Sequence, residues 1–291
     1  MRIIQNLSEM TETARGWLAG GTVGFVPTMG HLHAGHLTLV QAAQRECEIS
    51  VVSIFVNPFQ FDRVEDSALY PRNLSQDLQL LDNEHVDVAF VPRSEDIYPP
   101  YFSTYVTPDG AITQWLHRIN RFHYARGITT VTSKLFQLVR PDIVYYSQKN
   151  ALHVALVRQL IRDLNFDITL RALPVIRDHD GLPLNNRQHR QSAARRKALA
   201  LLYQALLTAR ELIEKGERDV AVIEKAMADV TATAPQLKLD YVLICDPLTF
   251  ERVGATLATP LPNTLIQIAG YAGNSYLVDN ILWMSDGYWL T

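Results

Sequence analysis

The sequence predicts an α/β protein in which a doubly wound parallel sheet is followed by a smaller α+β domain. Three observations lead to this prediction. Apolar strands alternate with segments of helical spacing as far as residue 176. The strands are almost continuously apolar, which is typical of a parallel sheet covered on both faces. Two helices and then three strands follow, which is the order of an α+β domain.

The first three elements form one βαβ unit. Residues 21–27 read as a short buried strand, and residues 36–47 carry apolar side chains at helical spacing. Residues 49–56 form a second buried strand. Together the three elements occupy about 35 residues, which is the size expected for a βαβ unit.

The alternation then continues along the chain. Helices are predicted at residues 74–84, 130–138 and 151–164, and strands at 86–91, 143–146 and 168–176. These elements complete a Rossmann-like domain over residues 1–178. A turn cluster at residues 178–181 marks the boundary. Residues 179–291 form the smaller domain, with helices at 192–215 and 219–233 and strands at 239–245, 265–269 and 276–283.

Composition excludes several classes of protein. The formal net charge of −3 does not favour a nucleic-acid partner. Cys47 and Cys245 lie in apolar runs without a shared motif, so we expect reduced thiols in a cytoplasmic protein. The N-terminus turns polar too early for a signal peptide, and the longest apolar run, near residues 198–207, is too short to cross a bilayer. We therefore expect no membrane partner.

The loop after the first strand carries the strongest chemical signal. Residues 27–36 read Pro-Thr-Met-Gly-His-Leu-His-Ala-Gly-His, and a helix follows at once. Ligands of open parallel sheets bind at the carboxyl ends of strands. The N-terminus of a helix offers N–H groups and a positive dipole to an anion, and Gly30 and Gly35 allow close approach of the backbone. His33 and His36 share one side of the first turn, where they can donate to a polyphosphate.

Two other roles are open to these histidines, namely half of a metal site or ordinary surface residues. No third ligand with zinc-like spacing lies nearby, and HExxH is absent. A P-loop, a GxGxxG motif after a strand and a GxSxG elbow are also absent. The pattern therefore favours a site for nucleotide phosphates, and the His-x-Gly-His tetrad resembles the signature of the nucleotidylyltransferase superfamily.

The full string at residues 27–36 resembles the pantothenate synthetase (pantoate–β-alanine ligase) family, and the resemblance covers nearly the whole chain. The next strand and its end read Val-Val-Ser-Ile-Phe-Val-Asn-Pro-Phe-Gln-Phe at residues 51–61. Further segments fit the order of the family: Tyr70-Pro71-Arg72, Ile97-Tyr98-Pro99, Ser133-Lys134-Leu135-Phe136 and Leu277-Val278-Asp279-Asn280.

This resemblance implies a cytoplasmic, homodimeric ligase with residues 179–291 as a lid domain. Such an enzyme uses ATP and Mg²⁺ to convert pantoate or a similar hydroxy acid to an acyl-adenylate, then joins it to β-alanine or a similar amine and releases AMP and pyrophosphate. The implied catalytic residues are His33, His36, Lys149 and Arg187, and the implied metal residue is Asp77. The implied nucleotide-binding residues are Pro27, Thr28, Met29, Gly35, Ser147, Asn150, Asn185 and Asn186. The implied acid-binding residues are Asn57, Gln60, Tyr70 and His153.

The chain departs from the family pattern at several polar positions. Asn150 replaces an Asp, and His153 replaces a Gln expected to hold pantoate. Asn185-Asn186 replaces a pair of serines, and Tyr124 replaces a His. A pocket with changed donors selects a different substrate. Two alternatives therefore stay open, a paralogue that joins a different acid and amine in secondary metabolism and a non-catalytic homologue.

An RNA-binding enzyme is a further alternative, because aminoacyl-tRNA synthetases use a similar His-x-Gly-His pattern. A basic stretch could contact RNA; its members are Arg187, Arg190, Arg195, Arg196 and Lys197. We favour a solvated helix start or a guide for pyrophosphate, since no room remains for an anticodon-binding region.

Overall fold

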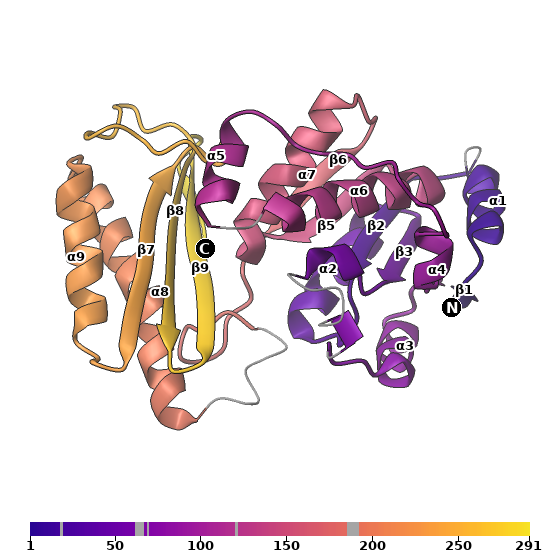
Figure 1. Cartoon of the computed structure of the whole chain (residues 1–291), viewed down its shortest axis with the longest axis horizontal. Coiled ribbons are helices and arrows are strands. Elements are labelled where there is room, and N and C mark those ends of the chain that lie inside the picture. The colour runs from indigo at the N-terminus through magenta and orange to yellow at the C-terminus, as the bar shows by residue number, and fades with distance from the viewer. Residues whose placement is uncertain (18–19, 62–66, 69, 120–121, 185–191) are drawn as a thin grey trace. The chain divides into compact units, whose positions relative to one another are not determined.

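The computed structural model describes residues 1–17, 20–61, 67–68, 70–119, 122–184 and 192–291 (Figure 1). Contacts between Cα atoms divide the chain into two compact units. The first unit comprises Met1–Ser147 and Leu152–Leu173, and the second comprises Gln148–Ala151 and Pro174–Thr291. This division falls at Pro174, a few residues before the predicted boundary at 178/179, because a proline cannot continue the ladder of the strand that ends at Leu173.

The first unit contains a six-stranded sheet whose pairings are all parallel, in the order β1-β4-β3-β2-β5-β6. Its strands are β1 (Arg2–Ile4), β2 (Val23–Thr28), β3 (Ile49–Ile54), β4 (Val88–Phe90), β5 (Ile143–Ser147) and β6 (Thr169–Leu173). The chain runs outward from β2 through β3 to β4, then returns to β5 on the other side of β2. The predicted doubly wound sheet is therefore confirmed, and its switch point lies between β2 and β5.

Helices cover both faces of this sheet. Val26 of β2 and Tyr145 of β5 are fully buried in the cluster that α2 joins through Val40 and Ala43. Phe25 of β2 precedes Val26 and is also fully buried. Successive side chains of a strand point to opposite faces, so neither face is open to water. The helices are α1 (Leu7–Trp17), α2 (Ala34–Glu46), α3 (Leu74–Asn83), α4 (Ser94–Ile97), α5 (Ala111–Arg118), α6 (Phe122–Val139) and α7 (Ala151–Asp163).

Every predicted helix and strand of the first unit is present, but the sequence analysis missed several elements. It did not predict β1, α1, α4 or α5, and it began α6 at residue 130 instead of Phe122. The first turns of α6 contain Gly127 and Thr129, residues of low helical propensity. Tertiary contacts compensate, since Thr129 Oγ1 donates to the carbonyl oxygen of Val106 at 2.6 Å.

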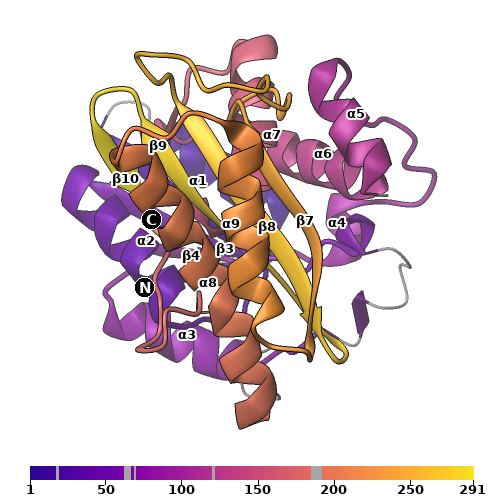
Figure 2. The same cartoon turned by 90° about the vertical axis from the view of Figure 1, so that its left-hand side faces the viewer.

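The second unit is an antiparallel sheet with two helices packed side by side on one face (Figure 2). Its strands run in the order β10-β9-β8-β7, and their bounds are β7 (Leu237–Cys245), β8 (Thr264–Ala272), β9 (Ser275–Met284) and β10 (Tyr288–Leu290). The helices are α8 (Ala193–Glu214) and α9 (Val220–Ala232). Ser192 and Asp219 cap their N-termini, as the predicted starts at these residues imply.

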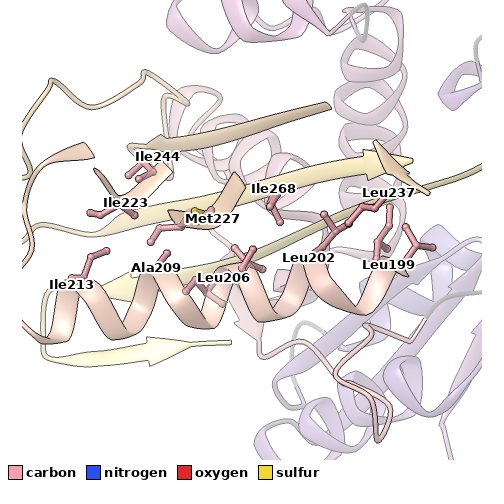
Figure 3. Close-up of a cluster of buried hydrophobic side chains, with 14 of the residues drawn as sticks. Leu199, Leu202, Leu206, Ala209, Ile213, Ile223, Met227, Leu237, Ile244 and Ile268 are labelled. Carbon is pink, nitrogen blue, oxygen red and sulfur yellow. The ribbon is translucent and has the colours of Figure 1, made fainter. Parts of the chain in front are cut away.

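One apolar cluster holds this unit together (Figure 3). Leu202, Leu206 and Ala209 of α8 are fully buried against Ile268 of β8. Ile223 and Met227 bring α9 into the same cluster, and Figure 3 shows the side chains of α8 pointing toward the strands.

Two further expectations concern the thiols and the membrane. Cys47 and Cys245 are both free, and Cys245 is buried. Burial raises the pKa of Cys47, which keeps the thiol protonated. Among the described residues, no helix has the length and apolar character that a bilayer crossing requires.

Replacing Leu206 by Ala should lower the free energy of unfolding by about 2–5 kcal/mol, because it leaves a cavity in a cluster that cannot fully collapse. Urea unfolding followed by tryptophan fluorescence measures this loss. Val222→Ala is the matched control, since Val222 is 45% exposed on α9, and should stay within about 0.5 kcal/mol. A loss below about 1 kcal/mol for Leu206→Ala would contradict the packing described above.

Candidate active site

A sharp turn carries the chain from β2 to α2. Thr28 ends β2, and its hydroxyl donates to the carbonyl oxygen of Ser53 at 2.7 Å. The same hydroxyl accepts from the backbone N–H of Gly30 at 3.2 Å. Gly30 has φ +77°, and a Cβ placed there would lie 2.9 Å from Oδ2 of Asp77. Both the backbone angle and the space therefore require glycine at this position.

Asp77 clamps this turn. Its Oδ2 accepts from the backbone N–H of His31 at 2.8 Å, and its Oδ1 accepts from that of Leu32 at 2.7 Å. The Asp77 side chain lies in the first turn of α3, and the residue is 2% exposed. Both oxygens are thus engaged with the backbone, which gives Asp77 a structural role that the sequence analysis did not predict. The metal role remains a prediction that this geometry does not favour.

His33 and His36 form a reciprocal cap on α2. His33 is the N-cap, and its Nδ1 accepts from the backbone N–H of Gly35 at 3.1 Å. Nδ1 of His36 accepts from the backbone N–H of His33 at 3.3 Å. The two ring centroids lie 4.1 Å apart. The rings therefore lie together at the start of the helix, as the spacing predicts, although His33 precedes the helix instead of belonging to its first turn.

This cap determines the protonation pattern of both rings. A ring nitrogen that accepts a hydrogen bond carries no proton, so the proton of each neutral ring is on Nε2. Each imidazole is then a hydrogen-bond donor through Nε2 at the N-terminus of a 13-residue helix. Two donors beside a positive helix dipole can stabilise negative charge on phosphate oxygens.

A cavity of about 230 Å³ adjoins this turn. Met29, Gly30 and Asp77 form one wall of it. The carboxyl ends of β3 and β4 contribute further lining, including Ile54, Val56, Val91 and Pro92. Its polar lining residues include Arg72, Asn73, Arg93 and Ser94. The cavity lies where open parallel sheets bind ligands.

Asn57 is positioned by contacts inside the first unit. It follows β3, is 1% exposed, and caps a short 3-10 helix, η1 (Pro58–Gln60). Its Nδ2 donates to the carbonyl oxygen of Gly127 at 3.0 Å, and its Oδ1 accepts from Phe59 N at 3.2 Å and from Tyr98 Oη at 2.9 Å. This geometry supports a positioning role for Asn57.

The other predicted acid-binding residues surround the same helix or lie on α7. Gln60 is half-buried at the end of η1, and the Tyr70 ring lies 6.0 Å from that of Phe61. His153 lies on α7, and its ring centroid is 5.0 Å from that of Tyr146. Desolvation by burial lowers the pKa of His153 to about 4, so its ring is neutral at pH 7.

The remaining predicted catalytic and nucleotide-binding residues belong to other segments of the chain. Ser147 ends β5 in the first unit, whereas Lys149 and Asn150 belong to the second unit. Asn150 is exposed and Lys149 is half-buried. Arg187, Asn185 and Asn186 lie outside the described residues.

Sequence reasoning missed two residues that shape the site. Tyr98 and Gly127 both hold Asn57, and a Cβ on Gly127 would lie 2.2 Å from the carbonyl oxygen of Phe59. Gly127 thus lets η1 pack directly on α6. Tyr98 was quoted only within the segment Ile97-Tyr98-Pro99, and neither residue was given a role, because their contacts with Asn57 join residues that are 41 and 70 positions apart.

The Asp77→Asn variant tests the clamp. An amide replaces one acceptor with a donor that faces a backbone N–H, so we expect a loss of about 1–3 kcal/mol in the free energy of unfolding without metal or nucleotide. Amide hydrogen exchange at His31 and Leu32 should also become faster. Asp82→Asn on the same helix, where the side chain is 66% exposed, is the control. Unchanged metal-free stability would indicate that Asp77 serves only as a metal ligand.

His153 should make stability depend on pH. Its pKa is lowered from 6.5 to about 4 in the folded chain, so the unfolded chain binds more protons between these values. Stability is therefore full above pH 6.5 and falls as the pH decreases toward 4. Between pH 7 and pH 5 the wild type should lose about 2 kcal/mol more than His153→Gln in urea unfolding. An equal loss in both proteins would contradict a half-buried ring that is neutral at pH 7, and exposed His85→Asn serves as the control.

Comparison with known proteins gives a consistent result. Residues 2–282 match the family described as Pantoate-beta-alanine ligase. The pantothenate synthetase of Thermosipho africanus is 42% identical over 97% of this chain and 100% of the relative. That of Chloroflexus aurantiacus is 40% identical over 99% of each chain.

Solved structures agree with this match. The pantothenate synthetase of Thermus thermophilus has a TM-score of 0.87 at 36% identity, covering 96% of this chain and 98% of that one. The pantoate-beta-alanine ligase of Francisella tularensis, complexed with beta-gamma ATP and beta-alanine, has a TM-score of 0.75 at 28% identity, covering 99% of both chains. The fold, the capped histidine pair and these similarities together show that the chain belongs to the pantoate–β-alanine ligase family.

Proposed function

We propose that this protein condenses pantoate with β-alanine at the expense of ATP, with an acyl-adenylate as the intermediate. The observation that carries the proposal is the capped pair His33 and His36, which presents two Nε2–H donors at the N-terminus of α2. Family membership over residues 2–282 supports the same activity. In the Francisella relative the names of the ligands, beta-gamma ATP and beta-alanine, fit the nucleotide and the amine of this reaction.

The reaction has two balanced steps. A carboxylate oxygen of pantoate attacks the α-phosphorus of ATP, the bond between the α-phosphorus and the bridging oxygen breaks, and pyrophosphate leaves. The amine nitrogen of β-alanine then attacks the acyl carbon, the bond from this carbon to the AMP oxygen breaks, and AMP leaves. The ammonium group of β-alanine has a pKa of about 10, so it loses a proton before the attack.

The protein acts on the first step through position and charge. Negative charge builds up on the pyrophosphate oxygens as the bond breaks, and the two Nε2–H groups together with the helix dipole stabilise it. The clamp on the turn keeps these donors in place, so little reorganisation is needed at the moment of reaction. The nucleotide contacts of Pro27, Thr28, Met29 and Gly35 are part of this proposal.

We assign the acid to the region around η1. Gln60 and Tyr70 would contact pantoate, and Asn57 would hold η1 for them. His153 is neutral at pH 7, so it would act on the acid as a hydrogen-bonding group and not as a cation. The predicted phosphate contacts of Lys149, Arg187 and Ser147 belong to the same proposal, as do those of the amides Asn150, Asn185 and Asn186.

Magnesium and the oligomeric state complete the proposal. ATP binds as its magnesium salt, whose metal screens the phosphate charges. Because both oxygens of Asp77 accept backbone N–H groups, Asp77 does not fit a preformed protein site for this ion, and we derive no step from it. We retain the homodimer as a family expectation, which light scattering tests.

Substitution of the histidines tests the proposed function. The wild type should catalyse ATP–pyrophosphate exchange that depends on pantoate, and His33→Ala or His36→Ala should lower its kcat about 10²- to 10³-fold because charge stabilisation is lost. His33→Asn separates the cap from the chemistry, since asparagine is a good N-cap but lacks Nε2. This variant should keep the wild-type Tm and lose exchange.

The surface variant His85→Asn should retain full exchange. Exchange that is unchanged in His33→Asn would refute the role of the ring. Exchange supported by other hydroxy acids but not by pantoate would refute the substrate.

A further inference from the structure

A buried polar network lies inside the second unit. Asp279 and Asn280 of β9 are both 0% exposed, and Gln148 is 2% exposed. Arg177 joins them from the segment that precedes α8. Burying an ion pair seldom stabilises a fold more than apolar side chains of the same size would. A network of this kind therefore calls for an explanation other than stability.

The ion pair at its centre is bidentate. Arg177 Nη1 donates to Oδ2 of Asp279 at 2.7 Å, and Nη2 donates to Oδ1 at 3.0 Å. The guanidinium carbon of Arg177 also lies 3.8 Å from the centroid of the Tyr203 ring. Burial raises the pKa of Asp279, whereas Arg177 and the charge of Lys149 favour the carboxylate. These contacts leave Arg177 and Asp279 a single relative orientation.

The pair in turn orients Asn280. Oδ1 of Asp279 accepts from the backbone N–H of Asn280 at 2.8 Å, and Arg177 Nη2 donates to the carbonyl oxygen of Asn280 at 3.3 Å. Both backbone polar groups of Asn280 are thus contacted by charged atoms. The backbone of Asn280 is held in place as a result.

The side chain of Asn280 contacts the short helix η3 (Gln148–Asn150), which carries Lys149. Nδ2 of Asn280 donates to the carbonyl oxygens of Gln148 and Lys149 at 3.1 and 3.3 Å. Oδ1 of Asn280 accepts from Nε2 of Gln148 at 3.2 Å. The buried amide of Asn280 therefore binds two successive carbonyls of η3. These bonds fix the position of the Lys149 backbone, and with it the origin of the Lys149 side chain.

We propose that Arg177, Asp279 and Asn280 are positioning residues that hold η3 so that Lys149 meets the phosphates of ATP. The inference rests on the proposed function, because Lys149 owes its phosphate role to that proposal. The three residues act through the backbone of η3, and none of them is assigned a contact with substrate. Displacement of a binding group by about 1 Å can reduce a rate about 10²-fold. A small shift of Lys149 after loss of the network would therefore lower activity strongly.

The Asn280→Ala variant tests this inference. We expect the affinity for ATP, measured by calorimetry, to fall about 10-fold and kcat/KM for ATP in pyrophosphate exchange to fall about 10- to 100-fold. Lys149→Ala should cause a loss of the same kind. In the double variant, Asn280→Ala should add less than about 3-fold to the effect of Lys149→Ala, because a positioning residue has nothing left to position.

Controls separate this role from ordinary stability. Ile223→Val and Met227→Ala remove buried apolar atoms of the same unit and should bracket the change in Tm of Asn280→Ala while keeping wild-type affinity for ATP. Gln148→Leu removes one contact and leaves both backbone carbonyls to Asn280, so its effect should be smaller than that of Asn280→Ala. If Asn280→Ala does not fold, Asn280→Ser supplies the same comparison with a shorter donor.

The outcomes distinguish this inference from the proposed function. Fully additive losses in the double variant, or unchanged affinity for ATP in Asn280→Ala, would overturn the positioning role. Unchanged ATP affinity in Lys149→Ala would overturn it as well. Wild-type protein that lacks exchange with pantoate, yet shows the non-additive losses of ATP affinity, would refute the proposed function and leave the positioning role standing.

Discussion

The carboxylate of Asp77 holds two consecutive backbone N–H groups, those of His31 and Leu32, and the candidate site depends on this contact. The partners are 45 and 46 positions apart in the sequence. Without the clamp, two N–H groups of a tight turn would lose a charged acceptor, and such groups are costly to bury unpaired. The clamp ends where α2 begins, so it also sets the position of His33. The chemistry proposed for the histidine pair therefore depends on the hydrogen bonds of Asp77, in which neither histidine ring takes part.

Two other loops are also held by a buried polar side chain that hydrogen-bonds to the backbone. Asn57 holds the turn after β3 through Phe59 and Gly127, and Asn280 holds η3 through two carbonyl groups. In each case a buried polar side chain hydrogen-bonds to backbone groups of a loop or of a neighbouring helix. Hydrogen bonds from buried side chains therefore help to order each of these loops, beside apolar contacts such as those of Leu32 and Phe59. Such loops keep their shape while presenting polar atoms to a ligand, which suits a reaction that depends on position and charge.

Much of the fold was accessible from the sequence because buried strands and amphipathic helices carry their own periodicity. The segments from β2 to β6 show it clearly, as do α8 and α9, and these strands and both helices were predicted. Elements whose stability comes from tertiary contacts were not predicted. The start of α6 has poor helical residues and depends on contacts such as that of Thr129 with Val106. β1 has only 3 residues, too few to show a period, and α5 is amphipathic but has only 8 residues and was overlooked.

For the site, the sequence by itself determined the histidine pair, the turn glycine and the helix that follows, because these features depend on the spacing of near neighbours along the chain. Only the tertiary structure decided what Asp77, Asn57 and Asn280 do. Each bonds to backbone groups tens of residues away, and a backbone group has no residue type that a sequence could display. A carboxylate reads as a metal ligand until its partners are known. The physical reason is that local order follows from residue type, whereas a buried polar side chain takes its role from whichever unpaired backbone groups the fold brings to it.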